Sequence, residues 1–271
     1  MALPSVCIVR SAGTNCDREA HYAFEEAGAF VERVHITALV ARPARLHDYH
    51  VLLIPGGFSY GDDLGAGTLL ANELTAFLGE ELRKFREARK IVLGICNGFQ
   101  VLVKSGLLPG VPDGQGPLAG EGAPRPQATL TNNDSGKFED RWVHLKVCSR
   151  KVDFLDQGAS TLYLPVAHGE GKFVARDEGV LRRLEENDQV VFRYVTPDGG
   201  PAAYPWNPNG SQGDIAGICD PTGRILGLMP HPERHAEATN HPRWTREGIS
   251  PRPDGAGLFA SAVRYVRERL L

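Results

Sequence analysis

Short apolar runs alternate with amphipathic stretches over the first part of the chain. The runs at 6–9, 30–36, 49–54 and 91–95 have the length and composition of buried strands. Between them, residues 20–27 and 69–89 carry apolar side chains at the three- and four-residue spacing of a helix. Strands that alternate with helices predict an α/β fold with a doubly wound, mostly parallel sheet, whose site lies at the carboxyl ends of the strands.

The second part of the chain follows a different pattern. Three segments, 128–131, 142–147 and 190–195, alternate apolar and polar residues, and we expect them to extend the sheet with antiparallel strands. Residues 107–126 are rich in Gly and Pro without an apolar period, which predicts a surface insertion. The segment 258–270 has the spacing of a core-packing helix. We therefore expect a single domain over residues 1–271, a size common for α/β domains.

Cys96 occupies the junction between the fourth apolar run and the apolar helix pattern that follows it. The sequence there is Gly94-Ile95-Cys96-Asn97-Gly98, the cysteine form of a nucleophile elbow. Glycines two residues before and after the nucleophile leave room for a strained strand-to-helix turn. The helix N-terminus then favours thiolate over thiol. The alternative interpretation is a small buried cysteine, which is what most free cysteines are.

His231 and Glu233 follow another apolar run near the other end of the chain, in Met229-Pro230-His231-Pro232-Glu233. A cysteine nucleophile needs a base that takes its proton and returns it to the leaving group. The base needs a carboxylate that fixes its tautomer and orientation. Taken alone, His231 could simply be a histidine at the end of a strand, and Glu233 an acidic residue at the start of a helix. Together with the elbow, they predict a catalytic triad of Cys96, His231 and Glu233.

Composition narrows the classes of function. The chain has 42% hydrophobic residues and a net charge of −3, and it lacks a basic stripe, which disfavours nucleic-acid binding. Five cysteines at irregular spacing fit a reducing compartment better than a disulfide scaffold. Residues 1–5 are too short and polar for a signal peptide, and no apolar run approaches the length of a membrane span. We therefore expect a cytoplasmic enzyme without a membrane partner.

The cysteine and histidine motifs together resemble the class I (triad) glutamine amidotransferases, which implies a flavodoxin-like amidotransferase fold. Further segments are similar to one branch of this family, the glutaminase component of phosphoribosylformylglycinamidine synthase. These segments are Pro55-Gly56-Gly57-Phe58-Ser59-Tyr60-Gly61-Asp62, Pro165-Val166-Ala167-His168-Gly169-Glu170-Gly171, and Asn207-Pro208-Asn209-Gly210-Ser211-Gln212 with Ile215-Ala216-Gly217-Ile218. The resemblance spans residues 6–267. It implies a chain that hydrolyses glutamine and passes ammonia onward in de novo purine biosynthesis.

The proposed chemistry predicts roles for residues outside the triad. A tetrahedral oxyanion needs preorganised donors. We expect one from the backbone N–H of Asn97, after the nucleophile, and one from the glycine turn at Gly57. The resemblance places Gln100 and the segment His168-Gly169-Glu170 around the amino-acid end of glutamine, where Glu170 would pair with the α-ammonium group. Solvated loop positions are the alternative for Gln100 and Glu170.

The expected cofactors and partner subunits are inferred from missing nucleotide-binding motifs and from the family resemblance. The sequence has neither a Walker motif nor a complete G-x-G-x-x-G run, so we expect no cofactor in this chain. The resemblance implies a separate synthetase subunit that uses ATP and magnesium to convert formylglycinamide ribonucleotide into formylglycinamidine ribonucleotide. A small third subunit is present in some such complexes. The chain departs from the shorter bacterial forms after Asp62 and in its longer 107–126 insertion, and both departures concern the subunit interface.

Other interpretations stay open at this stage. A triad amidotransferase could serve another acceptor. A non-catalytic ThiJ-like binding module shares the sheet and the elbow, but such proteins place a histidine directly after the cysteine, where Asn97 stands here. A metal site would combine Glu233 with His231, His235 and His241. The H-E-x-x-H arrangement is missing, because Pro232 replaces its glutamate, so we expect no metal and surface positions for His235 and His241.

Overall fold

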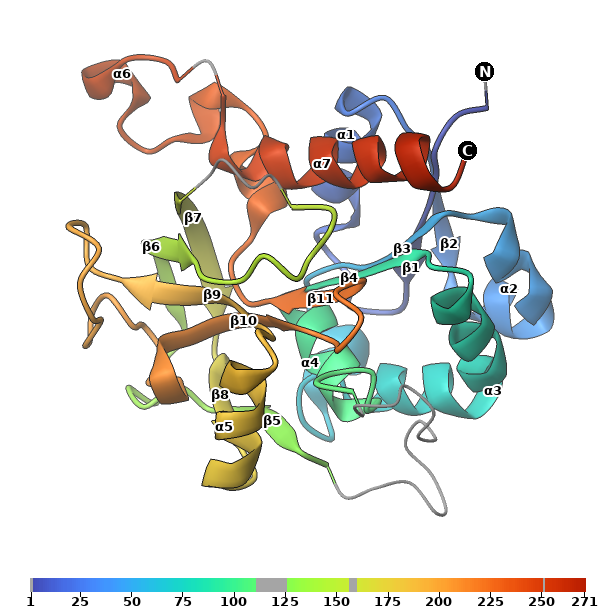
Figure 1. Cartoon of the computed structure of the whole chain (residues 1–271), viewed down its shortest axis with the longest axis horizontal. Coiled ribbons are helices and arrows are strands. Elements are labelled where there is room, and N and C mark those ends of the chain that lie inside the picture. The colour runs from blue at the N-terminus through green and yellow to red at the C-terminus, as the bar shows by residue number, and fades with distance from the viewer. Residues whose placement is uncertain (1, 111–125, 156–159, 251) are drawn as a thin grey trace.

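A nine-stranded sheet runs through the molecule in the order β2-β1-β3-β4-β11-β10-β9-β6-β7 (Figure 1). The computed structural model describes residues 2–110, 126–155, 160–250 and 252–271. Most of the insertion expected at 107–126 therefore lies outside the described residues.

The first five strands in this order are parallel, as the apolar runs predict. They are β2 (Phe30–His35), β1 (Ser5–Arg10), β3 (Val51–Ile54), β4 (Ile91–Ile95) and β11 (Ile225–Leu228). Every residue of β3, β4 and β11 is buried, which explains why these strands read as continuous apolar runs instead of alternating ones. The order β2-β1-β3-β4 is that of flavodoxin-like folds. The expected α/β sheet is thus confirmed.

An antiparallel part completes the sheet. It contains β10 (Ile215–Cys219), β9 (Val190–Val195), β6 (Glu139–Val147) and β7 (Thr161–His168). The expectation for 142–147 and 190–195 is confirmed, whereas that for 128–131 is wrong. Strand β5 (Ala128–Thr131) pairs instead with β8 (Lys172–Ala175) in a separate two-stranded sheet. Leu130 and Phe173 are partners there and both are buried, so this pairing brings two apolar side chains together in the protein interior.

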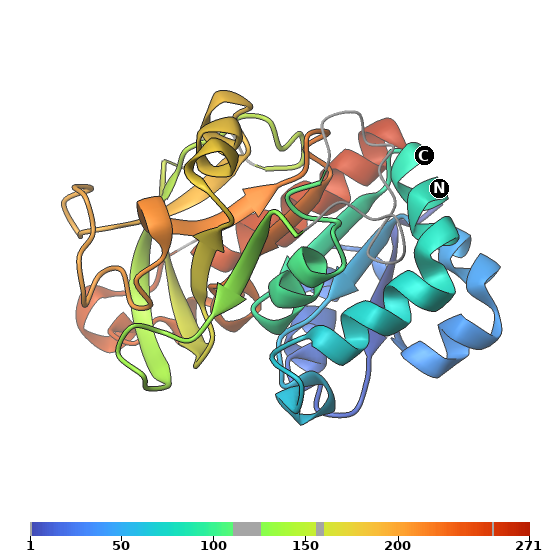
Figure 2. The ribbon, with the colours of Figure 1, turned by 90° about the horizontal axis from the view of Figure 1, so that it is seen from below.

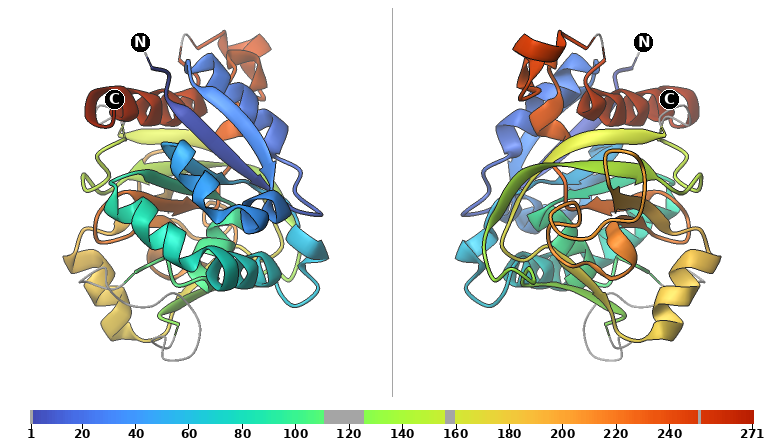
Figure 3. Two further views of the ribbon diagram at one scale, coloured as in Figure 1. Left: turned by 90° about the vertical axis from the view of Figure 1, so that its right-hand side faces the viewer. Right: turned by 90° about the vertical axis from the view of Figure 1, so that its left-hand side faces the viewer.

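Helices cover both faces of the parallel part (Figures 2 and 3). One face carries α1 (Asp17–Glu26) and α7 (Asp254–Arg269), which meet where Phe24 and Phe259 pack edge to face with ring centroids 4.9 Å apart. The other face carries α3 (Thr68–Glu87) and α4 (Asn97–Lys104). Shorter helices lie at the periphery: α2 (Ile36–Ala41), α5 (Glu178–Glu186) and α6 (Trp244–Glu247). None of the helices within the described ranges is long and apolar enough to cross a membrane.

Loops from four neighbouring strands converge at the carboxyl edge of the parallel part. The loop after β1 and the loop after β3 touch through a bridge between Thr14 and Gly57. Cys96 directly follows β4, and its N–H donates to the carbonyl oxygen of Leu228, at the end of β11. His231 comes three residues later, so the sheet brings positions from both ends of the chain together where α/β folds carry their sites.

Candidate active site

Cys96 adopts the strained turn that the glycine spacing predicts. Its φ of 52° and ψ of −107° lie outside the regions that a residue with a side chain prefers. A methyl group on Gly98 would overlap the carbonyl oxygen of Ile54, and one on Gly94 would come within 2.6 Å of the carbonyl oxygen of Gly98. Both glycines are therefore required because α4 packs directly against β3 and β4. The turn holds the Cys96 sulfur at the N-terminus of α4.

This close packing gives a stability prediction for Gly98. We expect Gly98→Ala to destabilise the protein by about 3 kcal/mol, because the added methyl must displace the backbone of β3. Gly257 is the matched control, since it lies in α7, is exposed and has no atom near its added methyl. Gly257→Ala should instead stabilise the protein by about 0.5–1 kcal/mol. Urea unfolding of the two variants measures both effects, and equal stability of the two would contradict the packing argument.

His231 and Glu233 form a buried pair beside the elbow. Their exposed fractions are 1% and 3%, and His231 Nδ1 lies 2.6 Å from Glu233 Oε1. Burial disfavours the imidazolium, but the negative charges of Glu233 and Cys96 outweigh it and hold the pKa of His231 well above its ordinary range. Glu233 lies in a short 3-10 turn, Pro232–His235, that begins directly after His231. The arrangement therefore combines a strained cysteine with an oriented imidazole that readily carries a proton.

Strand β7 lies over this pair and over the cysteine. The backbone N–H of His231 donates to the carbonyl oxygen of Pro165 over 2.8 Å. The Cys96 thiol lies 3.7 Å from the carbonyl oxygen of Ala167. The antiparallel part of the sheet thus fixes one side of the site, while β3 and β4 form its base.

The two expected oxyanion donors come from different elements, Gly57 from the loop after β3 and Asn97 from α4. The bridge from the loop after β3 to Thr14 is closed by two bonds, Asn15 N–H to the Gly56 carbonyl and Phe58 N–H to the Gly13 carbonyl, and neither uses the Gly57 N–H. A Cβ on Gly57 would come within 2.6 Å of the Gly13 carbonyl oxygen. The other expected donor, the Asn97 N–H, belongs to the first turn of α4, where backbone N–H groups lack helical acceptors.

The Asn97 side chain ties the elbow to its surroundings. Its Oδ1 accepts from the Ser59 N–H over 3.2 Å, and its Nδ2 donates to Asp62 Oδ1 and Gln100 Oε1. Gln100 is 4% exposed and donates through Nε2 to the carbonyl oxygen of Glu170 over 2.6 Å. Both polar ends of Gln100 therefore have protein partners, and the side chain joins α4 to the loop after β7. Its expected contact with glutamine stays a prediction.

His168 is deeply buried and held on both ring nitrogens. Its Nδ1 donates to Asn133 Oδ1 over 3.1 Å, and Asn209 Nδ2 approaches its Nε2 at 3.5 Å. Burial and the nearby His231 lower the pKa of His168 to about 3. The ring is thus neutral at physiological pH. Asn133 also accepts from the Gly171 N–H and donates to the His168 carbonyl, which fixes the loop that presents Gly169 and Glu170.

The sequence interpretation missed some residues of this region and misplaced others. The sequence gives no signal for Asn133 and, for Asn209, only its place in a motif, yet both side chains are buried and hydrogen-bonded to the loop after β7. Cys16 lies in the loop after β1 and yet is fully buried, because Gly56 and the His231 ring pack on it. Cys148 is the exposed cysteine instead.

His235 and His241 belong to an aromatic cluster around Trp142. The rings of His235 and His241 pack against Trp142 with centroids 5.0 and 5.8 Å away. His235 is only 3% exposed, so its expected surface position is wrong. Its Nδ1 donates to the carbonyl oxygen of Tyr163, which anchors the ring in this aromatic cluster.

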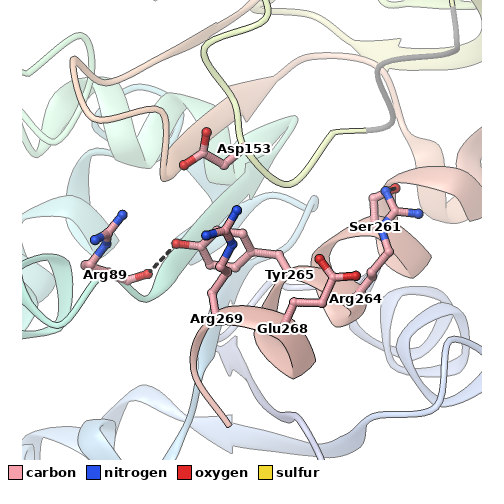
Figure 4. A pocket seen from close by; sticks show the side chains of 7 residues that line it. All are labelled: Arg89, Asp153, Ser261, Arg264, Tyr265, Glu268 and Arg269. Carbon is pink, nitrogen blue, oxygen red and sulfur yellow. Dashed lines mark hydrogen bonds between the residues drawn. The ribbon is translucent and has the colours of Figure 1, made fainter.

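A polar hollow of about 280 Å³ lies elsewhere in the molecule (Figure 4). It opens between the end of α7 and the turn between α3 and β4, where the Tyr265 hydroxyl donates to the Arg89 carbonyl. Its lining is charged and polar, from Arg89, Asp153, Ser261, Arg264, Tyr265, Glu268 and Arg269. Arg89 precedes β4 and Cys96 follows it, so the hollow lies at the opposite end of that strand and outside the candidate site.

Comparisons with known proteins agree with this geometry. Residues 3–266 match the model of the CobB/CobQ-like glutamine amidotransferase domain. The chain is 47% identical over 270 residues to phosphoribosylformylglycinamidine synthase subunit PurQ of Dehalococcoides mccartyi, covering 99% of this chain and 100% of that relative. The PurQ subunit of Methanococcus maripaludis is 43% identical, with 97% of each chain covered. A chain in the structure of PurLQS from Thermotoga maritima superposes with a TM-score of 0.72 at 32% identity, covering 98% of this chain and 100% of that chain.

Proposed function

The chain belongs to the family of CobB/CobQ-like glutamine amidotransferase domains, and we propose that it is the glutaminase component of phosphoribosylformylglycinamidine synthase. The observation that carries the chemistry is the buried His231–Glu233 pair beside the strained Cys96 turn. Similarity to PurQ subunits over nearly the whole chain supports phosphoribosylformylglycinamidine synthesis as the reaction that uses the ammonia.

The reaction is hydrolysis of the side-chain amide of glutamine. The Cys96 thiolate attacks the amide carbon and forms a tetrahedral oxyanion. His231 gives its proton to the departing nitrogen, so ammonia leaves and a glutamyl thioester remains on Cys96. Water then attacks the thioester and loses a proton to His231, which releases glutamate and restores the thiolate. Glu233 keeps the imidazole oriented and stabilises its positive charge.

Backbone donors stabilise the oxyanion, and the loop after β7 holds the rest of the substrate. The N–H groups of Gly57 and Asn97 face the developing negative charge. Gln100, His168, Gly169 and Glu170 form the pocket for the amino-acid end of glutamine. Glu170 pairs with the α-ammonium group, and backbone N–H groups at 168–169 hold the α-carboxylate. The hydrogen bond from Gln100 to the Glu170 carbonyl supports this arrangement, since it links the pocket to the elbow helix.

A synthetase subunit receives the ammonia and carries the ATP and magnesium of the overall reaction. It converts formylglycinamide ribonucleotide into formylglycinamidine ribonucleotide. Similarity to a chain of the Thermotoga maritima PurLQS structure supports this assembly, with a small third subunit as a further partner. The five cysteines of the chain are all free, which supports a cytoplasmic location.

Selective labelling tests the glutaminase site directly. We expect a diazo-ketone analogue of glutamine to modify Cys96 ahead of the other four cysteines, with free glutamine as a protecting competitor. Burial raises the pKa of Cys7 and of Cys219 to about 12, and also raises that of Cys16, so these thiols stay protonated.

Peptide mapping after labelling, with and without the synthetase subunit, gives the result. Cys148 is the internal control, because it is exposed and should label without regard to added glutamine. Labelling of Cys96 that glutamine does not reduce would contradict the proposal and favour a binding module.

A further inference from the structure

Cys16, His231 and Glu233 bring a thiol, an imidazole and a carboxylate together in the protein interior. Their ligand atoms all lie within 4.8 Å of one another, and all three side chains are buried. Cys16 Sγ lies 3.8 Å from His231 Nδ1, on the side of the ring that also faces Glu233. The proposed glutamine chemistry uses the last two residues and gives Cys16 no task.

These three groups are the donor types that zinc prefers. With ordinary Zn–S and Zn–N lengths, a tetrahedral ion holds its sulfur and nitrogen ligands about 3.6 Å apart, close to the 3.8 Å between Cys16 Sγ and His231 Nδ1. Glu233 Oε2 is buried and has no hydrogen-bond partner among the described residues, so a second carboxylate oxygen is available as a ligand. The 2.6 Å hydrogen bond between His231 and Glu233 would open to admit the ion.

We propose that Cys16, His231 and Glu233 form a site for a thiophilic divalent cation of the zinc type, which withdraws His231 from catalysis. Binding replaces two protons, one from the Cys16 thiol and one from the His231 imidazolium, by one ion of charge two. The total charge of the three residues and their occupants is zero before and after this exchange.

The positive charge of the neighbouring Arg234 opposes cation binding, but the charge balance of the exchange removes this difficulty. Its Nη2 lies 3.1 Å from Cys16 Sγ and would repel a cation. Because the exchange leaves the total charge of the cluster unchanged, Arg234 faces no added net charge. Its side chain is also only partly buried, so the guanidinium can turn toward solvent when the sulfur becomes a ligand.

The consequence for activity rests on the proposed function, whereas metal binding does not. An ion on Nδ1 takes the place of the proton that Glu233 orients, and its positive charge lowers the proton affinity of Nε2, so the imidazole no longer takes up and returns a proton. Glutamine-dependent synthesis should therefore fall as the site fills, while synthesis from ammonium salt should continue.

The binding test uses the inactive Cys96→Ala protein, so that its outcome is independent of glutaminase activity. Cobalt(II) is the probe, because a thiolate ligand gives it a charge-transfer band in the near ultraviolet. We expect this band, with release of about two protons per ion by calorimetry in buffers of different ionisation enthalpy. Cys16→Ser should weaken cobalt and zinc binding by more than roughly tenfold. Cys219→Ser is the matched control, another buried cysteine, and should leave the band unchanged.

Circular dichroism and thermal melting establish that each variant is folded, and Glu233→Gln replaces Cys16→Ser if the latter does not fold. Absence of the band, or a band that survives removal of both Cys16 and the Glu233 carboxylate, would overturn the site. Cobalt bound through Cys16 without loss of glutaminase activity in the wild type would overturn the withdrawal of His231. A chain that binds cobalt through Cys16 yet never hydrolyses glutamine would refute the proposed function alone.

Discussion

Replacement of Cys96 by alanine should lower glutamine-dependent synthesis by the reconstituted complex by at least about 10⁴-fold. Synthesis from added ammonium salt should stay near the wild-type rate. The reason is a division of labour: only the glutaminase step needs the thiolate, whereas the ligation step takes place on the synthetase subunit. Steady-state rates with each nitrogen source, measured on the same preparation, give the comparison.

Two controls make this result interpretable. Cys148→Ala removes an exposed thiol and should leave both rates unchanged. Gel filtration of the complex shows whether the Cys96→Ala subunit still assembles with its partner. If both nitrogen sources fail equally in an assembled complex, the proposed division between the two subunits is wrong.

The elbow could be predicted from the sequence because its geometry depends on few residues. Gly94 and Gly98 are needed wherever a helix packs directly on the strand before it, and a five-residue window records that need. The parallel strands were equally predictable, since β3, β4 and β11 are buried on both faces and therefore appear as continuous apolar runs.

Contacts between distant segments could not be predicted in the same way. The burial of Cys16 depends on His231, which lies 215 positions away in the sequence. Strand β5 pairs with β8, which lies about forty residues later in the sequence, and nothing in the sequence of β5 itself identifies that partner. The asparagines that hold the loop at 168–171 come from separate loops, and a single asparagine in a loop carries no sign of its partner.

Replacement of His231 by alanine should be almost as damaging as loss of Cys96, and Glu233→Gln should be less damaging by at least about tenfold. The base moves protons, whereas the carboxylate orients it and stabilises its charge. The double variant Cys96→Ala/His231→Ala should be no worse than either single variant, because one loss already disables the unit. His168 is a poor substitute base, since its pKa of about 3 leaves the ring unable to hold a proton near neutrality.

The pH profile of the Glu233→Gln variant should shift in one definite direction. Glu233 is the first of the groups that raise the pKa of His231, acting against desolvation, so its neutral replacement should bring that pKa down. The imidazolium must protonate the nitrogen that departs as ammonia, and therefore activity falls as the pH rises through the pKa of His231. The alkaline limb of the glutaminase profile should thus lie at lower pH in Glu233→Gln than in the wild type.

The profile of kcat against pH in the assembled complex measures this limb. Glu237→Gln, at an exposed carboxylate four residues further on, serves as the matched control. An alkaline limb that stays in place, or moves to higher pH, would show that Glu233 does not set the proton affinity of the catalytic base.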